Sequence, residues 1–340
     1  MTDRQIISAP RDADAEAYGH GLVDLLHPRL GAEVVFASDD FFAPKERMLD
    51  PEPPVFRTGE YDTNGKWMDG WESRRRRAGG HDHAIVRLGV PAVVQRVDLD
   101  TSFFTGNFPP AAAIDGCLST DRIPDAAADW QPLLPRADLQ GDRHNLFTLT
   151  GGGPVSHLRL SIFPDGGIAR FRAYGVVAFD WSAQDDSAVD LVALERGGCA
   201  LAWSDSHYGA PNALLAPGGG VNMGDGWETR RRRGPGYDWV LLRLGHPGRI
   251  ESVVVDTAHF KGNFPHSCAL QAGLAGDGDV AAIAAAAEAW PTLLPQTELA
   301  ADSEHVFDTL ADLGPVDHIR FCIHPDGGVS RLRLIGRPAR

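Results

Sequence analysis

Asp69 to Arg77 reads DGWESRRRR and Asp225 to Arg233 reads DGWETRRRR, so the chain contains one motif twice. A longer pair follows in the same order: GPVSHLRLSIFPDGGIARFRAYG begins at Gly153 and GPVDHIRFCIHPDGGVSRLRLIG at Gly314, with thirteen of 23 positions identical. The offset between the copies grows only from 156 residues at the first motif to 161 at the second. Solenoid repeats have periods of about 20 to 50 residues, so this period matches a whole domain. The chain is therefore a tandem duplication.

The length and the repeats together predict the domain organisation. A chain of 340 residues accommodates two domains that each bury a core of their own. In chain order we expect a lead-in at 1–30, a first repeat at 31–176, a connecting segment at 177–197 and a second repeat at 198–340. The apolar residues of the connecting segment predict a packed connection, and such segments often pack against neighbouring chains. We therefore expect a homo-oligomer.

Each copy contains many short stretches of alternating apolar and polar residues, which are typical of half-buried strands. AEVVFASDD, HAIVRLG and VVQRVDLDT predict three such strands in the first copy. The clearest local prediction is a hairpin, in which 157–163 and 169–173 form the strands and PDGG forms the turn. Alanine-rich stretches predict one helix in each copy, at 123–130 and at 280–290.

Short strands with turns between them, and only one helical stretch per copy, predict an all-β fold in which each copy is a β-sandwich. A jelly roll fits the strand spacing. The order of features is a strand ending in serine, an Asp-Gly loop and an aromatic-led strand closing in Leu-Gly. This order resembles sandwiches of the galactose-binding, discoidin-like type. We therefore predict two tandem jelly-roll modules of that type.

The charge of the chain restricts its partners. The formal net charge is −14, with 46 acidic against 32 basic residues, and an acidic chain repels polyanions at long range. We therefore expect no nucleic-acid partner, and we interpret the arginine runs as partners for carboxylates or a small anion. No run of about 18 apolar residues is present, so no membrane helix is expected. The first residues lack the apolar stretch of a signal peptide, which predicts a cytoplasmic protein.

The stretches ASDDFFAPKERML, DGWESRRRR, TGNFPP and HLRLSIFPDGG together resemble the allantoicase family, and the resemblance extends over both copies from Val34 to Gly336. Allantoicases consist of two such jelly-roll repeats, so the resemblance implies the fold that the strand pattern also predicts. It implies hydrolysis of allantoate to ureidoglycolate and urea, a step of allantoin degradation in purine metabolism. Allantoate is then the expected small-molecule substrate. The sequence requires no cofactor, and it leaves a divalent metal such as manganese open.

Allantoate carries two ureido groups and a carboxylate on one carbon, and this chemistry sets the demands on a site. A general acid protonates the departing urea nitrogen while the other ureido nitrogen supplies electrons, and a base-activated water then adds to the acyl-imine carbon. Carboxylates or a histidine could transfer these protons. A guanidinium can bind the substrate carboxylate with two hydrogen bonds. Ureido groups pair with backbone and carboxamide groups.

These demands select candidates within the repeated motifs. The candidate catalytic residues are Asp39, Asp40, Glu46, Asp69, Glu72, Asp205 and His207. The candidate substrate-binding residues are Arg74, Arg76, Asn107, Trp71, Arg230, Arg232, His259 and Asn263. Structural alternatives stay open: loop capping for the aspartates, turns for the Asp-Gly and Gly-Asn pairs, and surface ion pairs for the arginines. If the arginine runs lie in strands, at most about two side chains per copy reach one pocket, because alternate residues point to opposite faces.

Histidines distinguish the second copy from the first. His207, His259 and His266 could gather with Asp205 as acid-base groups or as metal ligands, or they could lie separately in solvated loops. The four cysteines have no CxxC spacing and are not equivalent between the copies, so we expect neither a disulfide framework nor a thiolate zinc site. A solvent-facing or inter-module role is expected for the residues on the polar face of each hairpin, which are His157, Arg159, His318 and Arg320.

Two other functions compete with an allantoate hydrolase. Jelly rolls also bind sugars, so the chain could be a tandem carbohydrate-binding or interaction module without catalytic activity. Such modules present shallow aromatic platforms and usually work outside the cell, whereas this chain gathers its recurring polar residues around the Asp-Gly-Trp-Glu and arginine motif. Alternatively, one copy is an inactive duplicate that only supports the other. The sequence leaves open which repeat carries the site.

Overall fold

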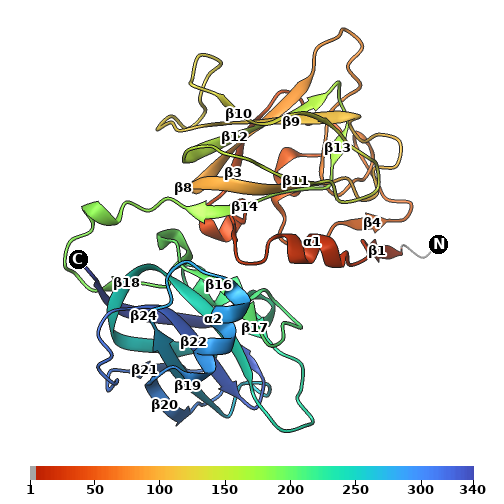
Figure 1. The fold of residues 1–340 in the computed structure, drawn as a ribbon. Coiled ribbons are helices and arrows are strands. Elements are labelled where there is room, and N and C mark those ends of the chain that lie inside the picture. The colour runs from red at the N-terminus through yellow and green to blue at the C-terminus, as the bar shows by residue number, and fades with distance from the viewer. Residues whose placement is uncertain (1–4) are drawn as a thin grey trace. The chain divides into compact units, whose positions relative to one another are not determined.

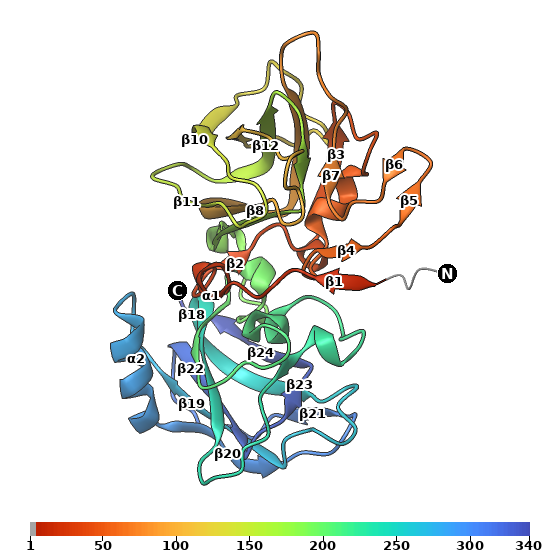
Figure 2. The same cartoon turned by 90° about the vertical axis from the view of Figure 1, so that its right-hand side faces the viewer.

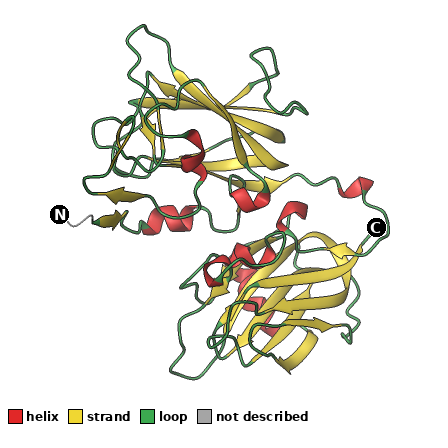
Figure 3. Cartoon of the chain, turned by 180° about the vertical axis from the view of Figure 1, so that it is seen from behind, coloured by secondary structure: helices red, strands yellow, loops and turns green. Residues whose placement is uncertain are grey.

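The computed structural model describes residues 5–340, which separate into two units. One unit contains Asp24–Ala178 with the chain before His20, and the other contains His20–Val23 and Phe179–Arg340. Strands make up most of the regular structure in both units, and the helices are short (Figures 1 and 3). Within residues 5–340, no helix combines the length and the apolar character that crossing a lipid bilayer requires.

The elements occur in nearly the same order in the two repeats, with η denoting a 3-10 helix. Along the first repeat they are β1 (Ile6–Ser8), α1 (Ala13–Tyr18), β2 (Val23–Asp24), η1 (Pro28–Leu30), β3 (Glu33–Ala37), η2 (Lys45–Leu49), β4 (Val55–Arg57), β5 (Tyr61–Asp62), β6 (Gly65–Lys66), β7 (Trp71–Glu72), β8 (Asp82–Asp100), β9 (Ala111–Cys117), β10 (Gln131–Asp138), β11 (Leu146–Thr148), β12 (Val155–Phe163), β13 (Gly167–Ile168) and β14 (Arg170–Val177).

The second repeat begins after Ala178. Its elements are η3 (Trp181–Ala183), β15 (Val189–Asp190), η4 (Leu194–Arg196), β16 (Cys199–Trp203), η5 (Pro211–Leu215), η6 (Met223–Asp225), β17 (Trp227–Glu228), β18 (Asp238–Asp256), β19 (Ser267–Gly273), α2 (Val280–Ala286), η7 (Ala287–Ala289), β20 (Thr292–Glu298), β21 (Glu304–Phe307), β22 (Val316–His324), β23 (Gly328–Val329) and β24 (Arg331–Pro338).

One long strand joins the two layers of each sandwich. The first half of β8 pairs antiparallel with β12 and β3, and its second half pairs with β14 and β11. The resulting strand order is β10-β9-β12-β8-β14-β2 in the first repeat and β20-β19-β22-β18-β24-β15 in the second. The prediction of two all-β jelly-roll modules is confirmed. The segments described from the sequence as a lead-in and a connection contribute β2 and β15 to these sheets.

Two local predictions about the strands are wrong. HAIVRLG and VVQRVDLDT form the single strand β8, which continues through the Val-Pro-Ala sequence between them. The predicted hairpin does not form either, because β12 and β14 pair with different halves of β8 and belong to different layers. The PDGG sequence is therefore a corner between layers. Its first glycine, Gly166, has a φ of 141°, and a Cβ on its second glycine, Gly167, would lie 1.9 Å from Phe104.

The alternation along β12 places an apolar face in the core, as predicted. Leu158, Leu160 and Ile162 are fully buried. The expectation of solvent exposure on the other face is wrong for three residues, because the exposed fraction is only 1% for His157, 2% for His318 and 5% for Arg320. These three side chains are therefore buried, whereas Arg159 on the same face is half-buried.

The two predicted helices have different outcomes. In the second repeat, Asp279 caps the N-terminus of α2, and η7 continues the helical stretch. In the first repeat no helix forms at 123–130, where the Asp125 carboxylate instead accepts hydrogen bonds from the backbone of a turn. The segment between the end of β9 and Trp130 has twelve residues (118–129), whereas the segment between the end of β19 and the equivalent Trp290 has sixteen (274–289). A proline in this short segment further disfavours a helix.

The helix in the second repeat covers the outer face of its sheet. Figure 2 shows α2 alongside β22 and β19. Ile283 and Ala287 from the helical stretch pack against Leu241 of β18, with Trp239 and Trp290 at the margin of this cluster. Residues 316–323 of β22 are all buried as a result, whereas the outer face of the equivalent strand β12 is only partly covered.

A buried ion pair in the first repeat lies beside the second half of β8. The imidazole Nδ1 of His144 is 2.7 Å from Asp98 Oδ2, and Asp100 lies on the same strand. Burial alone would lower the pKa of His144, but the hydrogen bond with Asp98 and the charges of both carboxylates outweigh it and raise the pKa to about 9. The histidine is therefore protonated at neutral pH.

This pair predicts a loss of stability in the alkaline range. Because the folded pKa of His144 lies above its unfolded value of about 6.5, its contribution is complete below pH 6.5 and is lost as the pH rises through about 9. The free energy of unfolding, measured with urea at a series of pH values, should fall by an amount on the order of 2 kcal/mol over that range. His144→Gln should remove this slope, and His305→Gln in the second repeat should retain it. Equal slopes in the wild type and His144→Gln would contradict the assignment.

Candidate functional site

The predicted site residues of the first repeat lie around the start of β8. Asp82 is 1% exposed, and its Oδ1 accepts hydrogen bonds from Ser38 Oγ (2.9 Å) and from Arg76 Nη2 (2.6 Å). The backbone N–H of His83 donates to Ser38 Oγ at 2.9 Å. Arg76 also donates its backbone N–H to Asp165 in the PDGG corner. A buried carboxylate therefore connects three loops to the central strand.

Asp39 forms the second junction of this network. Its carboxylate accepts the backbone N–H of Arg74 at 2.9 Å and the side-chain Nε of Arg74 at 2.6 Å. The Trp71 indole, fully buried, donates to the Asp39 carbonyl at 2.8 Å. Burial opposes ionisation of Asp39, but the hydrogen bonds from Arg74 outweigh it and lower the pKa of the carboxyl. An ionised aspartate in this environment is a cap for the arginine loop.

Two further carboxylates among the predicted residues have partners of their own. Glu72 accepts a hydrogen bond from Asn107 Nδ2 at 2.7 Å, and burial raises the pKa of its carboxyl. Asp69 pairs with the buried Arg170 at 2.9 Å and accepts the backbone N–H of Val55. The first pair lies at the surface and the second inside the repeat.

The second repeat contains the same contacts between equivalent residues. Trp227 donates to the Asp205 carbonyl at 2.9 Å, and Arg230 donates its backbone N–H to the Asp205 carboxylate at 2.7 Å. The other equivalent pairs are Ser204 with Asp238, Arg232 with Asp238 and Asp326, Asn263 with Glu228, and Asp225 with Arg331. The network is thus a property of the repeat and recurs beneath both sheets.

The arginine runs do not lie in strands, so their side chains do not alternate between two faces of a sheet. β7 and β17 end at the glutamate before each run, and the arginines that follow have irregular backbone. The limit that strand alternation would set on the arginines reaching one pocket therefore does not apply. The first and third arginine of each run instead engage aspartates. The remaining arginines, Arg75, Arg77, Arg231 and Arg233, are exposed.

Two predicted residues of the first repeat lie apart from the network. Lys45 Nζ is 3.4 Å from Asp40 and 2.7 Å from Glu46. Burial opposes ionisation of Glu46, but the Lys45 hydrogen bond outweighs it and lowers the pKa of that carboxyl. These carboxylates therefore form a surface cluster with a lysine.

The histidines of the second repeat do not gather. His259 Nε2 lies 3.0 Å from the Gly220 carbonyl, the His207 ring packs on Tyr208, and His266 lies 4.0 Å from Glu298. Among residues 5–340, no three carboxylate, imidazole or thiol side chains come together as a metal site would require. The suggestion that these histidines and Asp205 form one site is therefore wrong, because separate loops carry them and each has another partner.

A pocket of roughly 550 Å³ opens on the outer face of the first repeat's sheet. We call it the sheet-face pocket. Its polar lining comes from the adjacent strands β8, β12 and β9, and its rim from the segment that follows β9. The residues that line it are Phe36, His81, His83, Ile85, Ala113, Asp115, Ile123, Pro124, Asp125, Ala126, Trp130, Arg159, Ser161 and Phe163.

The charged groups of this pocket are already oriented. Arg159 donates Nη2 (2.8 Å) and Nε (3.2 Å) to Asp115, and its guanidinium lies 4.6 Å from the Trp130 ring centre. The His83 and Phe36 ring centres are 5.3 Å apart. Burial, followed by the positive charge of Arg159, lowers the pKa of His83, so its imidazole is neutral at pH 7. A cation, a carboxylate and a neutral imidazole therefore share one cavity.

Sequence reasoning missed these residues. The sequence predicts a solvent-facing or inter-module role for Arg159 and gives no local signal for His81, His83 and Asp115, because the strands that carry them are far apart in the sequence. A usable signal was present, because the second copy has Tyr237, Trp239 and Gln271 at the positions of His81, His83 and Asp115. Two histidines and a carboxylate in one copy, replaced by a tyrosine, a tryptophan and a carboxamide in the other, mark a face whose role has diverged.

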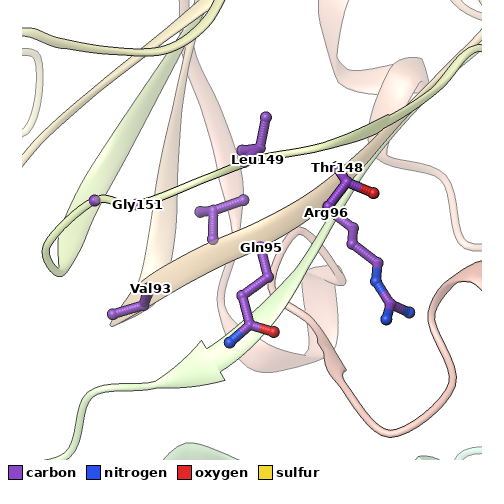
Figure 4. A pocket seen from close by; sticks show the side chains of 8 residues that line it. Val93, Gln95, Arg96, Thr148, Leu149 and Gly151 are labelled. Carbon is purple, nitrogen blue, oxygen red and sulfur yellow. The ribbon is translucent and has the colours of Figure 1, made fainter.

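A second hollow in the first repeat has less chemistry. It measures roughly 340 Å³ and lies between β8 and the chain that follows β11, where Figure 4 shows Gln95, Arg96 and Thr148. None of its described lining residues carries a carboxylate or an imidazole. Arg96 is held by the Tyr18 carbonyl at 2.6 Å. The arrangement therefore lacks the acid-base groups that C–N hydrolysis requires.

Comparison with known proteins adds an independent finding. The protein-family model that describes the allantoicase repeat matches this sequence twice, at residues 23–178 and 189–339. "Probable allantoicase 2" of Burkholderia pseudomallei is 54% identical, covering 96% of this chain and 98% of that protein, and "Probable allantoicase" of Pseudomonas paraeruginosa is 54% identical, covering 96% and 99%. The crystal structure of allantoicase from Saccharomyces cerevisiae is 32% identical with a TM-score of 0.82, covering 98% of this chain and all of that one.

The shared network predicts equal consequences of equivalent substitutions. Asp82→Asn and Asp238→Asn each leave an arginine and a serine without their carboxylate, so each should lower the free energy of unfolding by roughly 2–4 kcal/mol in urea titrations. Asp312→Asn removes an exposed ion pair with Arg249 and should cost less than about 1 kcal/mol. A loss at only one of the two buried positions would show that the network supports one repeat alone.

Proposed function

The chain belongs to the allantoicase family, and from that premise we infer that its two repeats serve one reaction, the hydrolysis of allantoate to ureidoglycolate and urea. The observation that carries this inference is the match of the family's repeat to both halves of the chain, together with 54% identity to relatives over almost its full length. The enzyme is thus a hydrolase that acts on a C–N bond outside peptides. Water is its second substrate.

We propose that the predicted site residues with equivalent partners in both repeats hold the loops in place. Asp39 with Arg74 and Asp205 with Arg230 make the same contacts beneath two outer faces that differ in shape and in chemistry. A group that reacts with substrate in one cavity has no reason to recur beneath a covered face. The same reasoning applies to Glu72 with Asn107 and to its equivalent pair. A catalytic role for these residues stays a prediction from the sequence.

We also propose that the protein acts in the cytoplasm as a homo-oligomer. The four cysteines are free and buried, as is usual in a reducing compartment. Large apolar side chains such as Ile6, Tyr61 and Leu118 are exposed, and such residues often form interfaces between subunits. Sedimentation velocity should give a mass that is a multiple of 36.6 kDa. A single species at that mass would contradict the proposed assembly.

The reaction predicts equal amounts of two products from one substrate. Purified folded protein incubated with allantoate should release urea and ureidoglycolate in a ratio of one to one, followed by a coupled urea assay and by NMR. Heat-denatured protein is the control. A folded preparation that releases no urea above this background, with or without added manganese, would contradict the reaction and leave the binding module as the better interpretation.

The framework role predicts that stability and activity respond differently to substitution. Asp39→Asn and Asp205→Asn each weaken the bonds to an arginine loop, so each should lower the free energy of unfolding by about 1–3 kcal/mol. The kcat of the folded fraction should change by less than about threefold in both variants. A loss of about a hundredfold or more in folded Asp39→Asn would instead support the catalytic role predicted from the sequence.

A further inference from the structure

The two repeats have the same framework but different outer sheet faces. In the first repeat, His83 lies opposite Ser161 in the β8–β12 ladder, and Arg159 lies opposite Asp115 in the β12–β9 ladder. Residues directly opposite in an antiparallel ladder point to the same face. The imidazole, the guanidinium and the carboxylate therefore converge on the sheet-face pocket from three neighbouring strands.

The equivalent face of the second repeat is closed. Trp239 lies opposite Cys322 and packs in the apolar cluster with Ile283 of α2. Arg320 donates Nη1 to the Tyr237 hydroxyl and to Gln271 Oε1, each at 3.0 Å, and is 5% exposed. The equivalent of Arg159 is thus retained, but neutral partners from its own repeat bind it, and a helix and a tryptophan occupy the volume of the pocket.

We propose that allantoate is bound and cleaved in the sheet-face pocket of the first repeat, where Arg159 and Asp115 hold the substrate and His83 acts as the general base. The proposal rests on the allantoate hydrolysis inferred above and assigns it to one place. The second repeat contributes the framework and no second site.

The lining of the pocket matches the groups of the substrate. The Arg159 guanidinium can bind the substrate carboxylate, because it is fixed by Asp115 and supported by the Trp130 ring before the substrate arrives. The Asp115 carboxylate can accept ureido N–H groups. Ligand pockets usually measure about 300–1,000 Å³, so a pocket of roughly 550 Å³ accommodates a small diureide anion. Phe36, Phe163 and Trp130 provide apolar walls.

The cleavage requires two proton transfers to the substrate and two from it. The Cα–N bond to one ureido group breaks, its electron pair stays on nitrogen, and that nitrogen takes a proton from a general acid and leaves as urea. The second ureido nitrogen forms a C=N bond and loses its proton to His83. Water then adds to the Cα carbon through a new C–O bond, one water proton restores the general acid, and the imine nitrogen regains its proton from His83. The product is ureidoglycolate, and the enzyme is unchanged.

The base must be neutral before each turnover. The charged and titratable groups whose charges act on His83 are Arg159 on β12, His81 and Asp82 immediately before it in the chain, and Arg76. Burial together with the positive charges outweighs Asp82 and lowers the pKa of His83 below the ordinary histidine value. The activity of the wild type should therefore persist below pH 6.5 and fall only when the pH passes through this lowered pKa. A variant without His83 should lose this acidic limb of the pH profile.

The test measures allantoate hydrolysis by the full chain and four variants. His83→Asn should lower kcat by about a hundredfold or more, as expected for loss of a general base. His83→Gly should be partly rescued by added imidazole, which a merely structural role would not produce. Arg159→Lys should raise KM by about tenfold or more, because lysine cannot make the paired hydrogen bonds of a guanidinium. His324→Asn, a histidine substitution on the equivalent face of the second repeat, should leave kcat and KM within about twofold of the wild type.

The outcomes separate this proposal from the one on which it rests. A wild type that releases no urea contradicts the reaction itself. A wild type that is active, with His83→Asn and Arg159→Lys folded by circular dichroism and equally active, contradicts only the assignment to the pocket. Loss of activity in His324→Asn comparable to that in His83→Asn would show that the second repeat takes part and would also overturn the proposal.

Discussion

A buried carboxylate at the start of the long central strand is the constraint on which each repeat depends. Asp82 and Asp238 are each about 1% exposed, and each binds a serine hydroxyl and an arginine guanidinium. Removing a carboxylate charge from water costs free energy, and hydrogen bonds and an opposite charge offset this cost only if the groups that provide them are held in place. The serine, the arginine loop and the PDGG corner are therefore held together where the strand begins. The backbone of the next residue, His83 or Trp239, is bound to the same serine.

This framework separates the fold of the repeat from the chemistry of its outer face. Because the anchoring contacts lie beneath the sheet and at its end, the residues that project from the outer face can change without disturbing them. A histidine follows the buried aspartate in one repeat and a tryptophan in the other. The segment from the end of β19 to Trp290 is four residues longer than the one from the end of β9 to Trp130, and it forms the helix that covers that face. Duplication thus left one repeat with a cavity and the other with a second layer of packing.

The sequence predicted the duplication, the all-β class and the jelly-roll repeats, because these depend on local alternation and on motifs that recur within the chain. It did not predict that HAIVRLG and VVQRVDLDT are one strand, since a strand that bends between layers has no local signal. It predicted a helix at 123–130 from the alanine content of that stretch, although the segment is short and contains a proline. The sheet-face pocket was missed for a related reason. Asp115, His83 and Arg159 meet only when three strands pair. The repeated motifs indicate the residues that the two copies share, whereas the pocket is formed by residues that differ between the copies.

If the sheet-face pocket is the substrate site, each chain has one such site, on the outer face of the first repeat. The most direct test is a crystal structure of the protein soaked with the product ureidoglycolate. The account predicts one bound molecule per chain, with its carboxylate at Arg159 and its ureido group within hydrogen-bond distance of Asp115 or His83. A molecule bound instead at the arginine loops, or at the equivalent face of the second repeat, would contradict it.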